Sequence, residues 1–508
     1  MKQKQVTIGI DLGTTTSLVG CSLKGIPIIF SNERGYLSTP CIVAFRNRQT
    51  AWVGELARNL LKNRQRDYVV VYPKKLLGTE KQYQIGKREY SPSEIILIIL
   101  RKLKTIAANY LKIKDNLIRK AILTVPAHFN DSQRLAVIKA GNLAGFNVVR
   151  PVSDPVAIAV AYEYSDKSNE ERLLVFDLGG GTLDVALIEI TDGCFFIRGL
   201  ASTDLVGGIN FDETLAKFLA RKFEEISGID FVSDPILYQN VLDVAEKTKI
   251  DLSFVEETEV LFPYLLPGNN TKKTYFNVTV NRSQFEKLTE PLFNQIRNTV
   301  MEVFRKSSIV PGWVSTLIIA GGASRIPKVE KILRDILPSK VNIKNHIHPE
   351  QAVAIGASIL SELIDNPERL SQLEFRHVTS YHLGLEDNEG NMVIVIPKGS
   401  TYPYEITRTF TTAEDNAKEA IIRIVQSKDP NDHNTIKVLG NIILDRLPPA
   451  KAGEPNIQIR FSIDEYGALK VSVQHPLTKE DVETVIKTGE WKGKNMKPER
   501  RGTGLRVV

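Results

Sequence analysis

The sequence predicts a duplicated α/β domain followed by a separate all-β domain. One phrase occurs twice, because residues 8–20 (IGIDLGTTTSLVG) and 175–186 (VFDLGGGTLDVA) both read as strand, Asp-Leu-Gly, small-residue turn and strand. Helical patterns separate the strands up to about residue 366. Beyond that point, strand-like runs take their place. The repeated phrase therefore indicates two related halves with a cleft between them.

Local signals support each element of the α/β part. Residues 6–10 alternate as a strand requires, and Leu173–Phe176 is a continuous apolar run, typical of a strand buried on both faces. Residues 91–111 are amphipathic with Pro92 near their start, which is typical of a helix. Further strand patterns lie at 121–127 and 316–322, and a further helix pattern lies at 349–364.

The all-β part is expected over residues 378–487. Its strand-like runs lie at 392–396, 420–425 and 457–473. The stretch 478–487 reads either as a last strand or as the start of a lid helix, and its pattern from Val482 to Ile486 favours the strand. We therefore expect an α/β domain at 1–370, a connector at 371–377, the β domain at 378–487 and a basic flexible tail at 488–508.

Composition excludes several classes of protein. The chain has 508 residues, of which 42% are hydrophobic and 25% charged, as in soluble globular proteins. The most apolar stretch, at 95–100, is too short to span a membrane, and the N-terminus does not resemble a signal peptide. The chain has three cysteines, an odd number, and no Cys-x-x-Cys pair. This pattern argues against a disulfide framework and against a zinc site, and it suits the reducing cytoplasm. Basic residues dominate 487–508, which we interpret as a solvated tail and not as a nucleic-acid or membrane arm.

The repeated phrase suits the binding of phosphates. Small-residue turns bring backbone N–H groups close to phosphates because no side chain intervenes. Mg²⁺ prefers oxygen ligands and is often held through its waters by carboxylates, which Asp11 and Asp177 supply at the same place in each copy. A single glycine-rich turn is most often a plain hairpin, but two matching copies favour nucleotide binding. The pattern is neither a Walker A loop nor a Rossmann fingerprint.

Nine motifs together resemble one protein family. In order along the chain, the motifs are GIDLGTTTSLVG, NERGYLSTPCIVAF, PKKLLG, ILTVPAHFNDSQR, AGNLAGFNVVR, VFDLGGGTLDV, AEKTKIDLS, AGGASRIPK and HPEQAVAIGAS. With these motifs the chain resembles the actin-like ATPases, and more closely the DnaK-type heat-shock chaperones of seventy kilodaltons, the Hsp70 family. The resemblance covers about residues 5–486 and implies an α/β actin-like (ribonuclease H-like) duplicated ATPase domain, an all-β sandwich peptide-binding domain and a chaperone that hydrolyses ATP.

The resemblance also implies the residues of an ATP site. Lys74 and Asp154 would orient the attacking water, with Asp177 and Thr182 completing the catalytic set. Asp11, Asp177 and Asp184 would position Mg²⁺ and K⁺. The ATP or ADP would be held by Asp11, Gly13, Thr14, Thr15, Thr16, Lys74, Gly179, Gly180, Gly181, Thr182, Gly208, Glu246, Lys249, Ser253, Gly322, Ala323, Ser324 and Arg325.

Partners follow from the same resemblance. It implies that the β domain binds unfolded or extended peptide segments, more loosely with ATP than after hydrolysis. A J-domain cochaperone and a nucleotide exchange factor are implied as further partners. We expect a monomer in the cytoplasm, without a specific nucleic-acid partner and without membrane attachment.

The ATPase part departs from the family pattern at Asp154 and at Glu350, where the family has an aspartate, and the connector departs as well. Asp154 stands where the family has a glutamate, so its carboxylate is one methylene shorter. Because a general base must come within hydrogen-bond reach of its water, we expect slow hydrolysis with ATP binding retained. The connector keeps one leucine, Leu373, of a leucine-rich run, so its docking on the ATPase domain is expected to be weak.

The β domain departs as well. Leu385, Phe410 and Ile422 match apolar positions of the family's peptide cleft, but Asn388 and Ala420 replace larger or more apolar residues. We expect altered peptide preference and, because the helical lid is not found in the pattern, fast peptide release.

Two other functions stay open from the sequence. One is a scaffold that holds ATP, turns it over little and binds one dedicated partner. The other is a small-molecule kinase of the same actin-like fold, against which the motifs at 382–473 argue.

Overall fold

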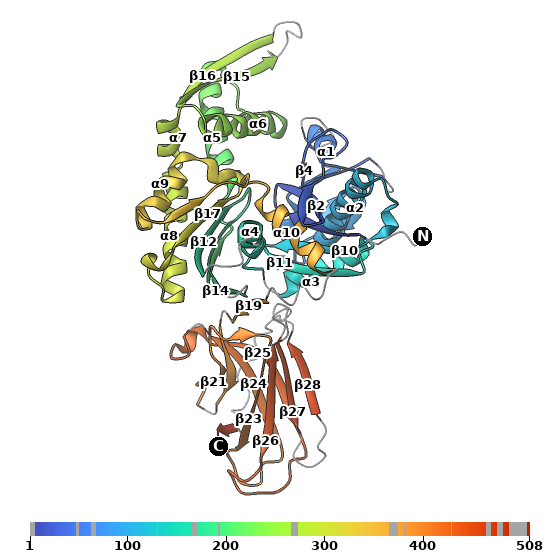
Figure 1. The fold of residues 1–508 in the computed structure, drawn as a ribbon, viewed down its shortest axis with the longest axis vertical. Helices are drawn as coiled ribbons and strands as arrows, with labels where there is room; N and C mark the ends of the chain where they lie inside the picture. The colour runs from blue at the N-terminus through green and yellow to red at the C-terminus, as the bar shows by residue number, and fades with distance from the viewer. Residues whose placement is uncertain are drawn as a thin grey trace. The chain divides into compact units, whose positions relative to one another are not determined.

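The computed structural model describes residues 6–46, 50–61, 68–129, 131–163, 170–191, 194–265, 273–364, 374–379, 381–387, 389–427, 429–463, 469–474, 481–486 and 505–507. The chain forms two compact units. The first unit is built from residues 1–374 apart from two short segments, and the second mainly from residues 375–508. Figure 1 shows the elements of both units.

Two sheets of matching topology form the first unit. The first half has the strand order β11-β10-β1-β2-β3, and the second half has β18-β17-β12-β13-β14. In each half the leading strand, β1 or β12, pairs in parallel with one neighbour and antiparallel with the next strand in sequence. The duplication predicted from the repeated phrase is therefore present in the topology. The bounds are β1 (Val6–Leu12), β2 (Thr16–Leu23), β3 (Ile26–Ile29), β10 (Ile118–Val125), β11 (Val148–Ser153), β12 (Glu171–Leu178), β13 (Leu183–Thr191), β14 (Cys194–Thr203), β17 (Thr316–Ala320) and β18 (Asn342–Lys344).

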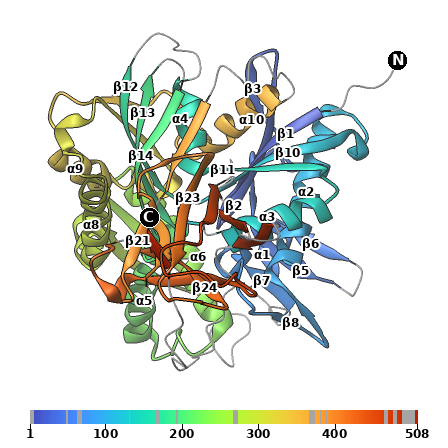
Figure 2. The ribbon, with the colours of Figure 1, turned by 90° about the horizontal axis from the view of Figure 1, so that it is seen from below.

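Helices cover both faces of these sheets. Figure 2 shows α2 on the side of β1 and β10, and α8 and α9 on the side of β12 and β13. The helix expected at 91–111 is confirmed as α2, which starts with a reciprocal capping box between Ser91 and Glu94. The bounds are α2 (Pro92–Leu111), α3 (Asp131–Leu143), α4 (Asp154–Glu163), α5 (Gly208–Ser227), α6 (Pro235–Leu252), α7 (Arg282–Leu288), α8 (Glu290–Ser307), α9 (Pro327–Ile336) and α10 (Ala352–Ile364).

The helices α4 and α10 cross between the two sheets. Helix α10 packs on β1 and β2 of the first half, whereas α4 packs on β12 and β13 of the second. The two helices touch backbone to backbone, because a Cβ at Gly356 would overlap the carbonyl group of Ala157. Helix α4 follows the strands of the first half in sequence but packs on the second, and α10 follows those of the second half but packs on the first.

Smaller elements complete the first unit. They are β4 (Ser38–Pro40), β5 (Ile42–Phe45), β6 (Ala51–Val53), α1 (Glu55–Leu60), β7 (Val69–Val71), the short helix η2 (Pro73–Leu76), β8 (Tyr83–Ile85), β9 (Arg88–Tyr90), η3 (Asp115–Leu117), β15 (Glu257–Leu265), β16 (Lys273–Asn281), η4 (Pro311–Trp313) and η5 (Gly322–Arg325). Each half has its own hydrophobic core, around Leu100 and Leu123 in the first and around Phe176 and Phe223 in the second. None of the described helices is both long and apolar enough to cross a membrane.

The second unit is a β-sandwich. One sheet has the order β21-β20-β24-β25 and the other β28-β27-β26-β23-β29, and both contribute to one apolar core. The strands are β19 (Glu374–Val378), β20 (His382–Glu386), β21 (Met392–Ile396), β22 (Thr401–Tyr402), β23 (Tyr404–Thr412), β24 (Ala420–Ser427), β25 (Lys437–Leu444), β26 (Ile457–Ile463), β27 (Leu469–Gln474), β28 (Asp481–Ile486) and β29 (Leu505–Val507), with a short helix η6 (His433–Thr435).

The boundaries expected for the second unit fall partly outside the described residues. Residues 371–373 of the connector lie outside them, and its remainder belongs to β19, which pairs with β22. The strand favoured at 478–487 is confirmed by β28. Of the tail at 488–508, only Leu505–Val507 is described, as a strand that pairs antiparallel with β23.

Candidate nucleotide-binding site

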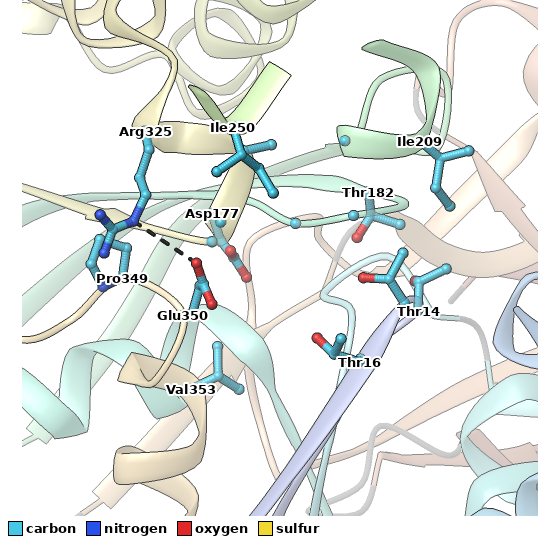
Figure 3. A pocket seen from close by; sticks show the side chains of 18 of the residues that line it. Thr14, Thr16, Asp177, Thr182, Ile209, Ile250, Arg325, Pro349, Glu350 and Val353 are labelled. Carbon is cyan, nitrogen blue, oxygen red and sulfur yellow. Dashed lines mark ion pairs between the residues drawn. The ribbon is translucent and has the colours of Figure 1, made fainter. Parts of the chain in front are cut away.

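A cavity of about 490 Å³ lies between the two halves of the first unit. This volume is within the range of small-molecule sites, about 300–1,000 Å³. Figure 3 shows Thr14, Thr16 and Thr182 on one side of the cavity and Arg325, Pro349 and Glu350 on the other. Both turns of the repeated phrase therefore face the same space.

The two turns pack directly against each other. A Cβ at Gly181 would lie 2.5 Å from Cγ2 of Thr14, and a Cβ at Gly180 would overlap the side chain of Thr15. The threonines of the first turn thus occupy the room that the glycines of the second turn leave. By contrast, a Cβ at Gly179 would meet its nearest neighbour at an ordinary 3.6 Å. Glycine is therefore required at 180 and 181 for close approach.

The second turn is joined to the start of α5. The amide of Gly208 donates to the carbonyl of Gly179 at 3.0 Å, and the amide of Ile209 donates to that of Gly180 at 2.8 Å. Gly208 and Ile209 also line the cavity. The first amides of α5 are therefore paired with the second turn, and the 20-residue helix fixes that turn at the cavity wall.

Three carboxylates converge on the cavity from different elements. Asp11 lies near the end of β1, Asp177 near the end of β12 and Asp154 at the start of α4, and all three line the cavity. Asp177 and Asp154 are 8% and 7% exposed, while Asp11 exposes part of its surface to the cavity. Burial, followed by the neighbouring Asp154, raises the pKa of Asp11 from 3.8 to about 7. Burial raises the pKa values of Asp154 and Asp177 as well.

These carboxylates suit a hydrated divalent cation. The raised pKa values show that burial and mutual repulsion of these carboxylates outweigh the positive charge near them, and a cation would favour their ionised forms. Oδ1 of Asp154 has no hydrogen-bond partner among the described residues. Within that same set, no three acidic, histidine or cysteine side chains converge tightly enough to hold a metal ion directly. Carboxylates at this spacing suit Mg²⁺ that keeps its waters, which is the ion's usual behaviour.

Lys74 brings a positive charge to these carboxylates. It is 4% exposed, and its Nζ donates to the carbonyl of Leu12 and lies 5.6 Å from the ring centre of Phe129. The nearby Tyr72 has a left-handed backbone with φ of 51°, an unusual conformation for a residue other than glycine. This bend at the start of η2 directs Lys74 into the cavity, while the adjacent Lys75 is exposed.

Asp184 lies behind the cavity wall and does not line it. It stands opposite Asp177 in the ladder between β12 and β13 and is 1% exposed. Its Oδ1 accepts hydrogen bonds from the amide of Ala127 at 3.1 Å and from Oγ of Ser202 at 2.7 Å. Its Oδ2 has no partner among the described residues. One oxygen of Asp184 is therefore buried without a hydrogen-bond partner in the part of the chain that the structure describes.

Helix α6 supplies a second wall of the cavity. Lys249 is 9% exposed and forms an ion pair with Asp212 at 2.7 Å. Burial raises the pKa of Asp212 from 3.8 to about 6, opposed by Lys249. Glu246 forms an ion pair with Arg58 of α1, which joins the two halves at the cavity. The helical spacing of Glu246, Lys249 and Ser253 thus places all three on the cavity side.

The wall opposite the threonines is formed by η5 and the segment before α10. Nη2 of Arg325 lies 2.6 Å from Nε2 of His348, and its Nε lies 3.9 Å from Oε1 of Glu350, an ion pair drawn in Figure 3. The guanidinium also lies 6.0 Å from the ring centre of Phe254. Oγ of Ser324 donates to the carbonyl of Gly321 at 2.6 Å, so Ser324 holds the turn and does not line the cavity.

Most predicted site residues line this one cavity. Those that line it are Asp11, Gly13, Thr14, Thr15, Thr16, Lys74, Asp154, Asp177, Gly179, Gly180, Thr182, Gly208, Glu246, Lys249, Ser253, Gly322, Ala323 and Arg325. Gly181, Asp184 and Ser324 lie outside its lining and support it through packing and hydrogen bonds.

Sequence reasoning missed several residues of the lining. These are Leu18, Ile209, Asp212, Phe254, Gly321, Ile326, His348, Pro349 and Val353. Most, Val353 among them, lie within a motif or one position from a predicted site residue, whereas Asp212 is brought to the cavity by the packing of α5. Phe254 had a signal, because an aromatic residue directly follows the motif serine Ser253.

The predicted peptide-cleft residues lie in the core of the second unit. Leu385, Phe410, Ala420 and Ile422 are at most 3% exposed and belong to one apolar cluster. Asn388 lies outside the described residues. In this state these side chains stabilise the sandwich and present almost no surface to a ligand.

Comparisons with known proteins agree with this architecture. The family model described as Hsp70 protein matches residues 7–85 and 78–499. The protein named Chaperone protein DnaK of Thermosipho melanesiensis is 34% identical over 503 residues, covering 95% of this chain and 83% of its own length. Those of Thermotoga neapolitana and Thermotoga maritima are also 34% identical, over 504 and 477 residues, with 96% and 93% of this chain covered and 83% and 79% of their own lengths.

Proposed function

The chain belongs to the Hsp70 family, and on this premise we propose how its residues divide the work of an ATP-dependent chaperone. It is a DnaK-type chaperone and ATPase, with an actin-like ATPase domain and a β-sandwich, and the family binds ATP or ADP with Mg²⁺. The comparisons do not favour a scaffold with little turnover. To this we add roles for particular residues, the limits of the domains and the partners.

The two packed turns hold the phosphates. The turn at 13–16 and the turn at 179–182 approach closely enough that Gly180 and Gly181 must lack side chains. Their backbone amides and the start of α5 surround one space, which suits a chain of phosphates better than a single anion. This close packing of two turns around one cavity is the observation that carries the proposal.

The carboxylates hold the cations. Asp11 and Asp177 would hold Mg²⁺ through its waters, and Asp184 would serve K⁺ with its unpaired Oδ2. When bound, Mg²⁺ neutralises charge on the phosphate oxygens. Repulsion from the neighbouring carboxylates, Asp11 among them, adds to burial in raising the pKa of Asp177. A cation between them would relieve that repulsion.

Lys74 and Asp154 position the attacking water. Both are buried at the cavity, with opposite charges close enough that Lys74 lowers the pKa of Asp154 against the larger effect of burial. Asp154 would accept a hydrogen bond from the water, and Lys74 would stabilise charge on the phosphate that is transferred. Thr182 would add a hydroxyl at the second turn. The shorter side chain of Asp154 keeps hydrolysis slow.

The adenosine lies between α6 and η5. Glu246, Lys249 and Ser253 line one wall, and Gly322 and Arg325 line the other. Ile250 is 49% exposed and also lines the cavity, so its apolar surface is available to a base.

The second unit binds extended peptide segments. A β-sandwich offers sheet edges to which a peptide adds by main-chain hydrogen bonds. We place the ATPase domain at 1–370, the connector at 371–377 and the peptide-binding sandwich at 378–487. A J-domain cochaperone, a nucleotide exchange factor, a monomeric state and a cytoplasmic location complete the proposal.

Single-turnover hydrolysis of ATP by the full chain tests the assigned roles. Lys74→Ala should lower the rate at least about 100-fold, because a preorganised charge at the transferred phosphate is lost. ADP affinity should change by no more than a few fold. Lys75→Ala, at the exposed neighbour, is the matched control and should hydrolyse ATP as the unmodified chain does. Equal rates for both variants would contradict the role of Lys74.

A further inference from the structure

We propose that strand β29, Leu505–Val507, occupies in cis the edge of β23 at which an extended peptide binds, and so competes with peptides for the second unit. This inference rests on the proposed peptide binding. It adds an occupant that is part of the chain itself and a particular stretch of sheet edge.

The pairing is defined residue by residue. Val507, Arg506 and Leu505 stand opposite Phe410, Thr411 and Thr412 in antiparallel register. Because β29 is the last strand in the order β28-β27-β26-β23-β29, it covers what would otherwise be the outer edge of β23. An uncovered strand edge is a template for pairing with another extended segment.

The covered edge carries unsatisfied polar groups. Thr411 and Thr412 are each 3% exposed, and neither hydroxyl oxygen has a hydrogen-bond partner among the described residues. Buried polar groups of native proteins are usually hydrogen-bonded. Both hydroxyls lack partners in the described structure with β29 in place, so a bound peptide whose side chains reach them would gain hydrogen bonds that β29 does not supply.

The segment has the chemistry of an extended ligand. Leu505 and Val507 place apolar residues at alternate strand positions, with Arg506 between them. In binding by strand addition, main-chain hydrogen bonds supply affinity and alternate side chains supply selectivity. A peptide with the pattern apolar, basic, apolar would pair with the same three residues of β23.

The chain is long enough to make this contact within one molecule. β28 ends at Ile486 on one edge of the five-stranded sheet, and β29 begins at Leu505 on the other. The four strand spacings between these edges measure roughly 19 Å. The connecting residues could extend over roughly 60 Å. A segment tethered in this way acts at an effective concentration of about a millimolar.

Peptide binding to full-length variants tests the competition. The probe is a fluorescein-labelled synthetic peptide with the sequence of residues 501–508, RGTGLRVV, followed by anisotropy. Arg506→Pro removes a backbone donor and restricts the backbone inside β29. It should bind the probe about tenfold or more tightly than the unmodified chain does. Arg500→Pro makes the same change outside β29 and should bind as the unmodified chain does.

The outcomes separate this inference from the proposed function. Equal affinity of all three proteins would overturn the competition while leaving peptide binding intact. No binding by any of them would contradict peptide binding by the second unit, and the competition with it. Circular dichroism shows whether each variant is folded.

A crosslink provides a second test. Thr411 and Arg506 stand opposite each other, at the Cα separation of about 4.5–5.5 Å that antiparallel pairs have and disulfides accept. The double variant Thr411→Cys, Arg506→Cys should form a disulfide under oxidation and lose at least about tenfold in probe affinity, with recovery on reduction. Arg506→Cys alone controls for pairing with Cys194. Failure to crosslink, or undiminished probe binding after crosslinking, would overturn the proposal.

Discussion

The hairpins that open the two halves of the first unit share a backbone but not a set of side chains. In the first, the turn carries Thr14 and Thr15, and Asp11 stands opposite Leu18. In the second, the turn carries glycines, and Asp177 stands opposite Asp184. The first turn supplies bulk, and the second supplies room for it and a second carboxylate. Duplication therefore gives two hairpins with the same backbone arrangement. Because their side chains differ, the two hairpins fit together and form one site.

Breaking the fit between the turns should have the largest effect. Gly180→Ala places a Cβ into the side chain of Thr15, so the turns must separate, and we expect ADP affinity to fall at least about 100-fold. Isothermal titration calorimetry measures this affinity. Gly179→Ala is the matched control, because its Cβ meets an ordinary contact at 3.6 Å. The double variant Thr15→Gly, Gly180→Ala should recover part of the affinity, and failure to do so would contradict steric interlocking.

The carboxylate of the first half should control how the stability of the nucleotide-free protein depends on pH. With the pKa of Asp11 raised from 3.8 to about 7, the folded protein keeps a proton that the unfolded chain loses between these values. The unfolded state then binds fewer protons, so the free energy of unfolding falls as the pH rises from about 4 to about 7. This fall should be on the order of 4 kcal/mol, at about 1.4 kcal/mol per pKa unit.

Chemical denaturation at several pH values measures how much Asp11 contributes to the free energy of unfolding. The side chain of Asp11→Asn cannot lose a proton, so this variant should lack the fall in stability between about pH 4 and about pH 7. Asp204→Asn, at an exposed position, should leave the profile unchanged. An identical profile for Asp11→Asn and the unmodified chain would contradict the assignment.

Changing the length of the side chain at Asp154, at the start of α4, tests whether its carboxylate lies at the right distance from the attacking water. Asp154→Glu lengthens the side chain by one methylene and should bring its carboxylate closer to the water. We expect single-turnover hydrolysis to rise about tenfold, since a misplacement of about 1 Å costs about 100-fold. Asp154→Asn should lower the rate instead. A slower Asp154→Glu enzyme would show that the site is built for the shorter side chain.

The smallest effect on nucleotide binding should come from the wall where we place the adenine base. There the second half contributes the exposed aromatic ring of Phe254. Phe254 is 66% exposed and lies 6.0 Å from the Arg325 guanidinium. We expect Phe254→Ala to release a fluorescent ADP analogue about threefold faster in stopped-flow measurements, because about 0.5–1 kcal/mol of ring contact is lost. Val255→Ala changes an exposed neighbour outside the cavity lining and should release at the original rate.

The sequence predicted those parts of the fold and site that depend on local pattern. Residues 173–176 are buried as their apolar run indicates, and α2 begins at Pro92, the residue that its pattern places near the start of the helix. The position of Asp212 could not be predicted, because it lies in no quoted motif and tertiary packing brings it to the cavity. Asp184 carries a predicted role yet lies behind the wall, since strand alternation fixes a face but not the depth of a side chain.

The second unit shows the limit of residue matching more clearly. Phe410 and Ile422 match ligand-contacting positions in a pattern, yet the structure buries both in the core. A pattern identifies an apolar position without stating whether a ligand or the protein covers it. In the same way, composition described residues 488–508 as a basic tail, and only the strand ladder reveals that Leu505–Val507 pair with β23.

The contact between Gly356 and Ala157 has a mechanical consequence. The helices meet backbone to backbone at this position, so any side chain at 356 would push α10 away from α4. Because α10 packs on the first half and α4 on the second, that shift would change the spacing of the two hairpins. A substitution at 356 would thus alter the width of the cavity without contacting the nucleotide.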